Sequence, residues 1–352
     1  MKSLVKNLFV ATAIVATFAS CNAQAGSSAD VQPTKRQLLQ QFLNPQDKSD
    51  YVPAAFFLHF ADKLGDKAAQ SHIQYFRATN MDFVKIQYEQ VVPVTVKEPA
   101  DLAKVPVYDQ EYWKPQVETI RQIADSLRGE AFILPTVYSP LALIHQSVGR
   151  GVSHDDFLKL LTADPALTEQ AFANLEKSIE NYIAAARQAG ADGFYVSSQG
   201  GDNKSLAGTT LWKDFVRKYD KKVSEYAYSV SDLTILHVCD YGSSYSDLDS
   251  YADYPSTIIN PPIHLEGGEV DLRHIAEVFK RPVFGGLDRL GSIAKGSLAD
   301  AKAEVDRVLQ NAPEQFILGA DCTVPSETDY GKLRAIIDYA HSWRRTHGTN
   351  NN

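Results

Sequence analysis

The chain has 352 residues, of which 44% are hydrophobic and 22% charged, so it can bury a large core and is not a disordered protein. Its 43 aspartate and glutamate residues outnumber 35 lysine and arginine residues, and this balance argues against nucleic acid or an anionic membrane surface as the main partner. Beyond the first 25 residues, no apolar run reaches the length of a membrane-spanning helix, which is about 18 residues or more.

Residues 1–25 have the pattern of an export signal. Two lysines precede an apolar stretch of 12 residues, Leu8 to Ala19. The small residues just before Cys21 are typical of bacterial lipoproteins and predict a lipid anchor on that cysteine, while Ala23-Gln24-Ala25 offers an alternative site for ordinary signal peptidase. Both readings predict an exported protein, periplasmic or at the cell surface, with residues 26–34 as a polar tether.

Short apolar runs alternate with amphipathic helical stretches along the rest of the chain. This alternation predicts parallel strands joined by helical crossovers, and eight runs favour a closed (β/α)8 barrel, a single domain over residues 35–345 before a polar tail, 346–352. An open dinucleotide-binding sheet is the weaker alternative, because no glycine-rich phosphate motif follows any run. The predicted strands are Ala54–Phe60, Phe83–Tyr88, Phe132–Tyr138, Gly193–Ser198, Thr234–Cys239, Thr257–Pro262, Pro282–Leu287 and Phe316–Cys322. The predicted helices include Gln116–Leu127, Leu167–Ala189, Leu211–Val230, Leu272–Phe279, Ala299–Gln310 and Tyr330–Arg345.

The two cysteines outside the leader end two of these predicted strands. His237 and Cys239 are two residues apart on the fifth strand and so point to the same side, and Cys322 ends the eighth. Catalytic groups gather at this end of a barrel. One imidazole and two thiolates are ligands that zinc accepts, and three protein ligands leave a fourth position open, as in catalytic zinc sites. A disulfide between the two cysteines is the alternative in an oxidising compartment, but it gives no reason for His237.

Other side chains are expected at the mouth of the barrel. His59 ends the first predicted strand and is either a catalytic residue or a packed core histidine. Tyr138 and Gln199 follow later strands and are candidates for binding a cofactor or substrate. Asp288 is either a catalytic carboxylate or a turn former. Gly285-Gly286 is expected to mark close approach of the backbone to a bound group.

Five segments resemble the uroporphyrinogen decarboxylase superfamily, which also contains zinc-dependent methyltransferases that work with methylated corrinoids. They occur in the expected order between Lys35 and His341. The last one, which ends in Cys322, is similar to the final strand of the methyltransferase branch. The segments are Asp82–Glu89, Tyr138–Leu141, Gly190–Phe194, Gly285–Asp288 and Phe316–Cys322.

The resemblance implies an (β/α)8 barrel, a Zn²⁺ cofactor held by the His-x-Cys pair and the later cysteine, and a corrinoid or other tetrapyrrole, on a carrier protein, as a partner. Glu89 matches the acidic position on the family's second strand, with Gln87 as the competing residue. The decarboxylases carry arginines near the first strand that hold the substrate's carboxylates, whereas here no arginine follows that strand before Arg77. This difference favours the methyltransferase branch.

Two classes of function therefore stay open. The first is an exported enzyme for a small-molecule substrate, expected to transfer a methyl group to a thiol-type acceptor through an open zinc site, with decarboxylation of the uroporphyrinogen decarboxylase kind as the runner-up. The second is a non-catalytic lipoprotein that holds a tetrapyrrole or corrinoid in the barrel mouth. A metal bound through both cysteines favours the enzyme, and a coloured, tightly bound tetrapyrrole favours the binding protein.

Overall fold

The computed structural model describes residues 32–46, 49–93, 95–149, 151–240 and 243–343, and the chain from Pro33 onward forms one compact unit. The predicted leader with Cys21, most of the tether and the polar tail lie outside the described residues. Within the described ranges, no helix has the length and apolar character needed to cross a membrane.

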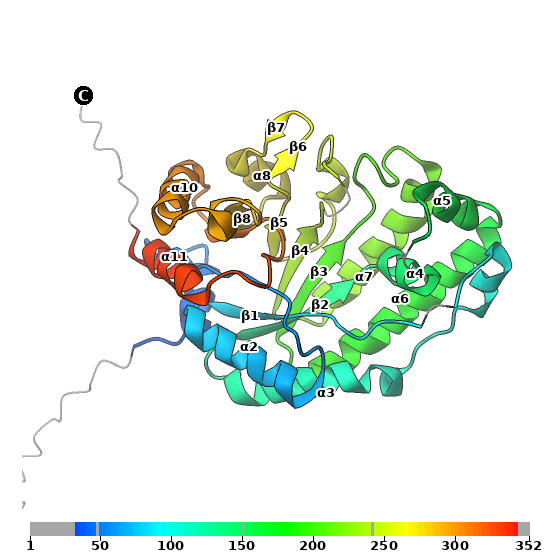
Figure 1. The fold of residues 1–352 in the computed structure, drawn as a ribbon, viewed down its shortest axis with the longest axis horizontal. Coiled ribbons are helices and arrows are strands. Elements are labelled where there is room, and N and C mark those ends of the chain that lie inside the picture. The colour runs from blue at the N-terminus through cyan, green and yellow to red at the C-terminus, as the bar shows by residue number, and fades with distance from the viewer. Residues whose placement is uncertain (1–31, 47–48, 94, 150, 241–242, 344–352) are drawn as a thin grey trace, which may run out of the picture. The chain divides into compact units, whose positions relative to one another are not determined.

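Seven parallel strands form a curled sheet at the centre of this unit (Figure 1). Each is a short apolar run buried on both faces, as expected where helices cover a parallel sheet. Neighbouring strands follow chain order, so each helical crossover leads to the adjacent strand. In sheet order the strands are β1 (Phe83–Ile86), β2 (Phe132–Tyr138), β3 (Gly193–Ser198), β4 (Leu233–Val238), β5 (Ile258–Asn260), β8 (Val283–Leu287) and β9 (Phe316–Ala320).

The first predicted strand, Ala54–Phe60, is an extended segment without a regular ladder. It makes one parallel bridge, Ala54 with Leu318, flanked by hydrogen bonds between Ala55 N and Leu318 O (3.0 Å) and between Leu318 N and Pro53 O (2.8 Å). On its other side, Asp82 N donates to Ala54 O at 3.0 Å. The segment therefore connects β9 to the start of β1 and closes the barrel. The predicted eight-stranded barrel is confirmed, although its first strand is irregular.

Helices surround the sheet, and the six predicted helical stretches are present, Leu272–Phe279 with the predicted bounds and the other five with one or both ends shifted (Figure 1). The crossover from β2 to β3 carries two short helices, α4 and α5, before its long helix α6, and a small hairpin of β6 (His264–Leu265) and β7 (Gly268–Glu269) follows β5. The α-helices are α1 (Lys35–Phe42), α2 (Gly65–Thr79), α3 (Gln110–Leu127), α4 (Pro140–Val148), α5 (His154–Thr162), α6 (Pro165–Gln188), α7 (Arg217–Ser229), α8 (Leu272–Phe279), α9 (Ser292–Lys295), α10 (Leu298–Asn311) and α11 (Tyr330–Ser342). Short 3₁₀ turns cover Pro99–Lys104 and Asp249–Tyr251, and a π-helical turn, Trp212–Val216, leads into α7.

Side chains fill the barrel interior. Phe57, Phe83 and Phe284 contact one another at ring-centroid distances of 5.5–5.7 Å, and Tyr195 joins them through Phe57. The fully buried Asn260 accepts from the Tyr195 hydroxyl at 2.6 Å and donates to the carbonyls of Phe284 and Ala320, at 2.8 and 3.3 Å. This amide connects four strands from the inside, so the part of the barrel interior below the strand ends is a packed core.

Candidate metal centre

His237, Cys239 and Cys322 come together at the carboxyl end of the barrel. His237 is on β4, Cys239 follows that strand, and Cys322 follows β9. One ligand atom from each residue lies within 4.8 Å of the other two. Both cysteines are free thiols, so the structure does not form the alternative disulfide. The parallel strands bring ligands 83 residues apart in the sequence to one end of the barrel.

The cluster has the donor chemistry of a zinc site. Ligand atoms around one tetrahedral zinc ion lie roughly 3.3–3.8 Å apart, so closing this cluster on an ion takes about 1 Å of side-chain movement. A hydrogen bond with Cys239 holds the pKa of the Cys322 thiol well below its usual range; burial opposes this shift, and the charges of His237 and Lys85 add to it. The buried Nδ1 of His237 has no hydrogen-bond partner within the described part of the chain. A low-pKa thiol and an unpartnered imidazole nitrogen both fit a metal ligand set.

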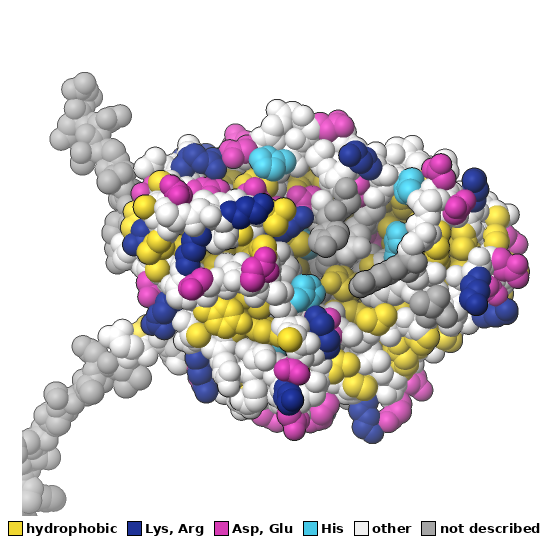
Figure 2. All heavy atoms as spheres, viewed as in Figure 1, with side chains coloured by type: hydrophobic (Ala, Val, Ile, Leu, Met, Phe, Trp, Pro, Cys, Tyr) yellow, Lys and Arg dark blue, Asp and Glu magenta, His cyan; other side chains and the backbone are white. Residues whose placement is uncertain are grey.

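A cavity of about 650 Å³ opens onto the cluster. That volume is within the range of small-molecule sites. Figure 2 shows a depression in the middle of this face, with histidine side chains near its rim. The lining combines the three cluster residues with polar and basic side chains from most strand ends: His59, Lys85, Thr136, Tyr138, His145, Gln146, Tyr195, Ser197, Gln199, Arg289, Thr323 and Ser326.

Lys85 is a functional candidate that the sequence reading missed. Its side chain is only 7% exposed, and Nζ donates to Gln87 Oε1 at 2.9 Å and to Thr323 Oγ1 at 3.5 Å. Nζ also lies 4.8 Å from the centroid of the Tyr195 ring. Burial lowers the pKa of Lys85 to about 8, and the charges of Cys322, Cys239 and Glu89 oppose this effect. The sequence did contain a signal for this residue, namely a lysine within an apolar strand run, because lysine is rarely buried unless it has a partner.

Arg289 connects the two strand ends that carry the cysteines. Its Nη1 donates to Asp240 Oδ1 at 2.9 Å and to Asp321 Oδ2 at 3.2 Å, and its backbone N–H donates to Asp321 Oδ1 at 2.8 Å. Asp240 follows Cys239, and Asp321 precedes Cys322. The two aspartates point away from the ligand positions on strand alternation. The contacts show that both aspartates bind the guanidinium group of Arg289 and so support the cluster without being ligands themselves.

His59 and Glu89 meet at the rim of the cavity. His59 Nδ1 lies 2.8 Å from Glu89 Oε1, and Lys63 Nζ lies 3.2 Å from the same oxygen. Burial alone would raise the pKa of Glu89, but the hydrogen bond and charge of His59, with the charge of Lys63, lower it. The competing residue, Gln87, is buried and donates to Leu58 O at 2.9 Å, so it connects the first segment to β1.

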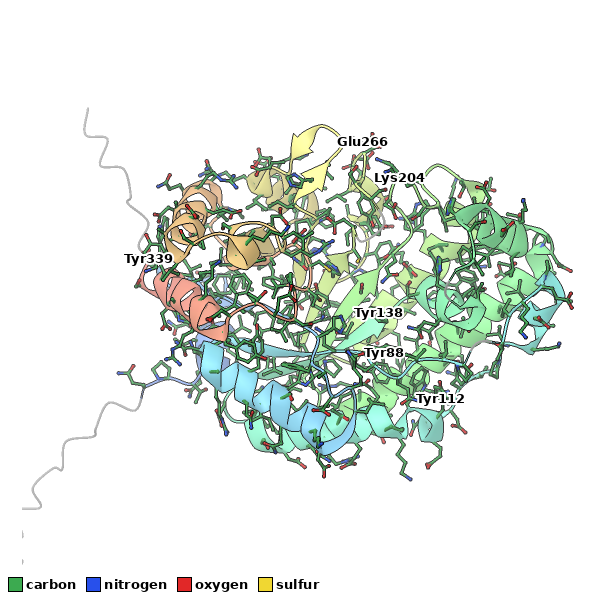
Figure 3. The ribbon with its side chains drawn as sticks, viewed as in Figure 1. Tyr88, Tyr112, Tyr138, Lys204, Glu266 and Tyr339 are labelled. Atoms are coloured by element: carbon green, nitrogen blue, oxygen red, sulfur yellow. The ribbon has the colours of Figure 1, made fainter. Side chains whose placement is uncertain are left out.

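The remaining predicted site residues divide into two groups. Tyr138 and Gln199 line the cavity. Tyr138 lies at the end of β2, where its ring packs edge-on against Tyr88 at 5.1 Å (Figure 3). Asp288 and the two glycines at 285 and 286 do not line the cavity, and their predicted roles stay predictions.

The protein's own atoms account for these last residues. The Asp288 carboxylate accepts from Leu290 N at 2.7 Å, as a turn former does. A Cβ at Gly285 would lie 3.1 Å from Asn260 Nδ2 inside the barrel, and one at Gly286 would lie 2.6 Å from Val308 in α10. The close approach expected at these glycines is therefore to the core and the helix layer.

Comparisons with known proteins agree with this architecture. Residues 66–343 match the family description of uroporphyrinogen decarboxylase (URO-D). A methyltransferase from Methanosarcina mazei has a similar fold, with a TM-score of 0.66 and 16% identity over 88% of this chain and 98% of that chain. A B12-independent methionine synthase from Shewanella sp. W3-18-1, solved in complex with selenomethionine, is also similar, with a TM-score of 0.54 and 12% identity over 82% of this chain and 94% of that chain. No curated protein sequence matches the chain.

Proposed function

The chain belongs to the uroporphyrinogen decarboxylase family, and from this membership we propose that it is an enzyme that transfers a methyl group to a thiol at a zinc site. The observation that carries the proposal is the convergence of His237, Cys239 and Cys322 within 4.8 Å beside a cavity of about 650 Å³. The ligand set leaves one position for a substrate, as catalytic zinc sites do.

Bound zinc would supply a Lewis acid that keeps a substrate thiol deprotonated near neutral pH. The protein residues would then balance the negative charge at the site and accept the proton of the thiol. Two cysteine thiolates and a substrate thiolate outweigh the charge of one divalent ion, and Lys85 supplies positive charge next to Thr323, the neighbour of Cys322. His59, held by Glu89 at 2.8 Å, is a base in the cavity lining that is placed to take the thiol proton.

The structural neighbours support the choice between branches. Two proteins with this fold are a methyltransferase and a methionine synthase in complex with selenomethionine, which carries a methyl group on selenium. Arg289 in the cavity lining is already paired with Asp240 and Asp321. Among the described residues of the lining, Lys85 is then the one lysine or arginine that has no described carboxylate within ion-pair distance. A substrate with many carboxylates, such as a porphyrinogen, needs more cationic partners than this.

Zinc content of the purified protein tests the proposal. We expect one zinc ion per chain, and His237→Ala, Cys239→Ser and Cys322→Ser should each weaken zinc binding by at least about tenfold while the barrel stays folded. His274→Ala, on the exposed side of α8, is the matched control and should keep full zinc content. Two reactive thiols and no zinc in protein purified under mild conditions would contradict the proposal.

We also propose that the enzyme is exported and held at a membrane by a lipid on Cys21, because of the predicted leader. The small-molecule acceptor is a thiol. The resemblance to corrinoid-dependent methyltransferases points to a methylated corrinoid on a carrier protein as the donor. The proposed export would separate the enzyme from carriers in the cytoplasm, which favours a donor that reaches the site without such a carrier.

A further inference from the structure

A second chamber adjoins the main cavity. It has a volume of about 390 Å³, at the small end of the range for ligand sites. Cys239, Gln199 and His145 line both spaces, so the chamber meets the main cavity beside the metal cluster. Its walls come from α4, α5 and the loop after β3: Leu141, His145, Val152, His154, Phe157, Gln199, Gly200, Asp202, Ser205, Leu206 and Cys239.

Asp202 gives the chamber its charge. Among the described residues it is the only carboxylate in the lining, and none of the described lining residues is a lysine or an arginine. The residue is 2% exposed, and its Oδ1 accepts hydrogen bonds from Ser243 Oγ at 2.5 Å and from Lys204 N at 3.3 Å. The Lys204 side chain itself is on the exposed side of the loop (Figure 3). No basic side chain among the described residues lies within ion-pair distance of Asp202, although buried carboxylates usually have such a partner.

Apolar and aromatic side chains form one wall of the chamber, and the uncharged Gln199 and Ser205 and the imidazoles of His145 and His154 complete the lining. Phe157 stacks on His145 at a centroid distance of 3.9 Å, and Leu141, Val152 and Leu206 complete the wall. Burial, and after it the charge of His154, lowers the pKa of His145 and so disfavours a positive charge on that imidazole. One carboxylate among apolar groups is too few oxygen ligands for a hard metal cation, since Ca²⁺ takes about six to eight. The same surroundings suit an organic cation with methyl groups.

We propose that this chamber binds the methyl donor as a small sulfonium cation, with Asp202 as its counter-charge. The inference rests on the proposed function, because it places the donor beside Cys239 and the acceptor thiol in the main cavity. In the transfer, the thiolate sulfur attacks the methyl carbon and forms a new S–C bond. The C–S bond of the sulfonium breaks, and its electron pair stays on the departing thioether. The thiolate charge and the sulfonium charge cancel, so the step needs no oxidant, reductant or corrinoid.

The arrangement also separates two reactants of opposite charge. Lys85 lines the main cavity but not the chamber, whereas Asp202 lines the chamber but not the main cavity. An anionic thiol is therefore attracted to one side of the cluster and a sulfonium cation to the other.

Gly200 allows the loop after β3 to lie directly against α4. Its φ is +90°, and a Cβ at this position would lie 2.3 Å from Leu141 Cδ2.

Trimethylsulfonium is the probe that tests the inference. Calorimetry should show that it binds the mature protein, and Asp202→Asn should weaken this binding at least tenfold while zinc content is unchanged. Asp155→Asn removes the same charge from the exposed start of α5 and is the matched control, with affinity unchanged. Val152→Lys adds a positive charge at the 44%-exposed rim without disturbing buried atoms, and should also weaken binding.

The outcomes separate this inference from the proposed function. No binding of trimethylsulfonium to the wild-type protein, or equal affinity in wild type, Asp202→Asn and Val152→Lys, would overturn the sulfonium chamber even if one zinc ion is bound. Absence of zinc from the wild-type protein would instead overturn the proposed function. Trimethylsulfonium binding is measured separately from zinc content. Dimethyl sulfide should bind more weakly than trimethylsulfonium because it lacks the charge, and equal binding would also refute the role of Asp202.

Discussion

Replacing Lys85 by methionine should make the protein more stable and less active. The lysine is almost completely buried, and burial lowers its pKa from 10.5 to about 8. One pKa unit corresponds to about 1.4 kcal/mol, so keeping this lysine charged costs the folded state about 3 kcal/mol at pH 7. Removing its hydrogen bond to Gln87 costs about 1 kcal/mol. The expected net gain in the free energy of unfolding is about 2 kcal/mol.

The lowered pKa of Lys85 also predicts how the stability difference between the wild type and Lys85→Met changes with pH. Because the folded pKa lies below the unfolded value, the unfolded chain holds the proton more tightly between pH 8 and 10.5. The stability of the wild type therefore rises with pH through this window relative to Lys85→Met. The advantage of the variant is complete below pH 8 and disappears towards pH 10.5.

Urea unfolding of metal-free protein at pH 7 and pH 10 measures both effects. Lys63→Met is the control, because that lysine side chain is 51% exposed and should show no comparable gain. Thiol methylation by Lys85→Met should fall at the same time, since the charge beside the cluster is lost. A variant that is less stable than the wild type at pH 7, or a gain that does not change with pH, would refute the reasoning about burial.

Three further predictions follow from the sequence and the fold. Expression with the native leader should give an acylated, membrane-associated product, and Cys21→Ala should abolish the acylation; mass spectrometry decides, and a mature chain starting at Gly26 would rule out the lipid anchor. Asn260→Ala should lower the free energy of unfolding by about 3–5 kcal/mol, because the Tyr195 hydroxyl and two strand carbonyls lose a buried partner; a loss below about 1 kcal/mol in urea titrations would contradict this role. Uroporphyrinogen should not be decarboxylated at a useful rate in an anaerobic assay read by chromatography, since pairing its carboxylates needs more cations than the cavity offers, and efficient conversion would reverse the choice of branch.

Periodicity predicted the barrel well because seven of its strands are continuous apolar runs buried on both faces. The first run was harder, since Pro53 has no N–H for a ladder and the segment from Ala54 makes only isolated bonds to its neighbours. The Gly285-Gly286 pair illustrates a second limit. A glycine pattern indicates that something approaches closely, but the sequence does not distinguish a bound group from Asn260 and the helix layer.

The convergence of His237, Cys239 and Cys322 could be predicted because these are rare residues at the ends of recognisable strands. Lys85 was missed because a lysine within an apolar run does not by itself show where its side chain lies, and only the packed barrel shows that it lines the cavity. Asp202 has no sequence signal, since an aspartate in a glycine-containing loop is usually solvated. The inference about Asp202 depends on the packed fold, in which no described basic side chain lies within ion-pair distance of its carboxylate. The sequence alone does not show such distances.

The bridge through Arg289 has a consequence for the order in which the protein assembles. Asp240 and Asp321 hold the two cysteine-bearing strand ends to one guanidinium group through the protein's own atoms. On the proposed zinc site, folding and metal loading would then be separate events, unlike in small zinc domains, where the ion is needed for folding. On the proposed export, the chain would fold first and take its ion from the new compartment afterwards. Loss of the ion would leave an intact barrel that is ready to be reloaded.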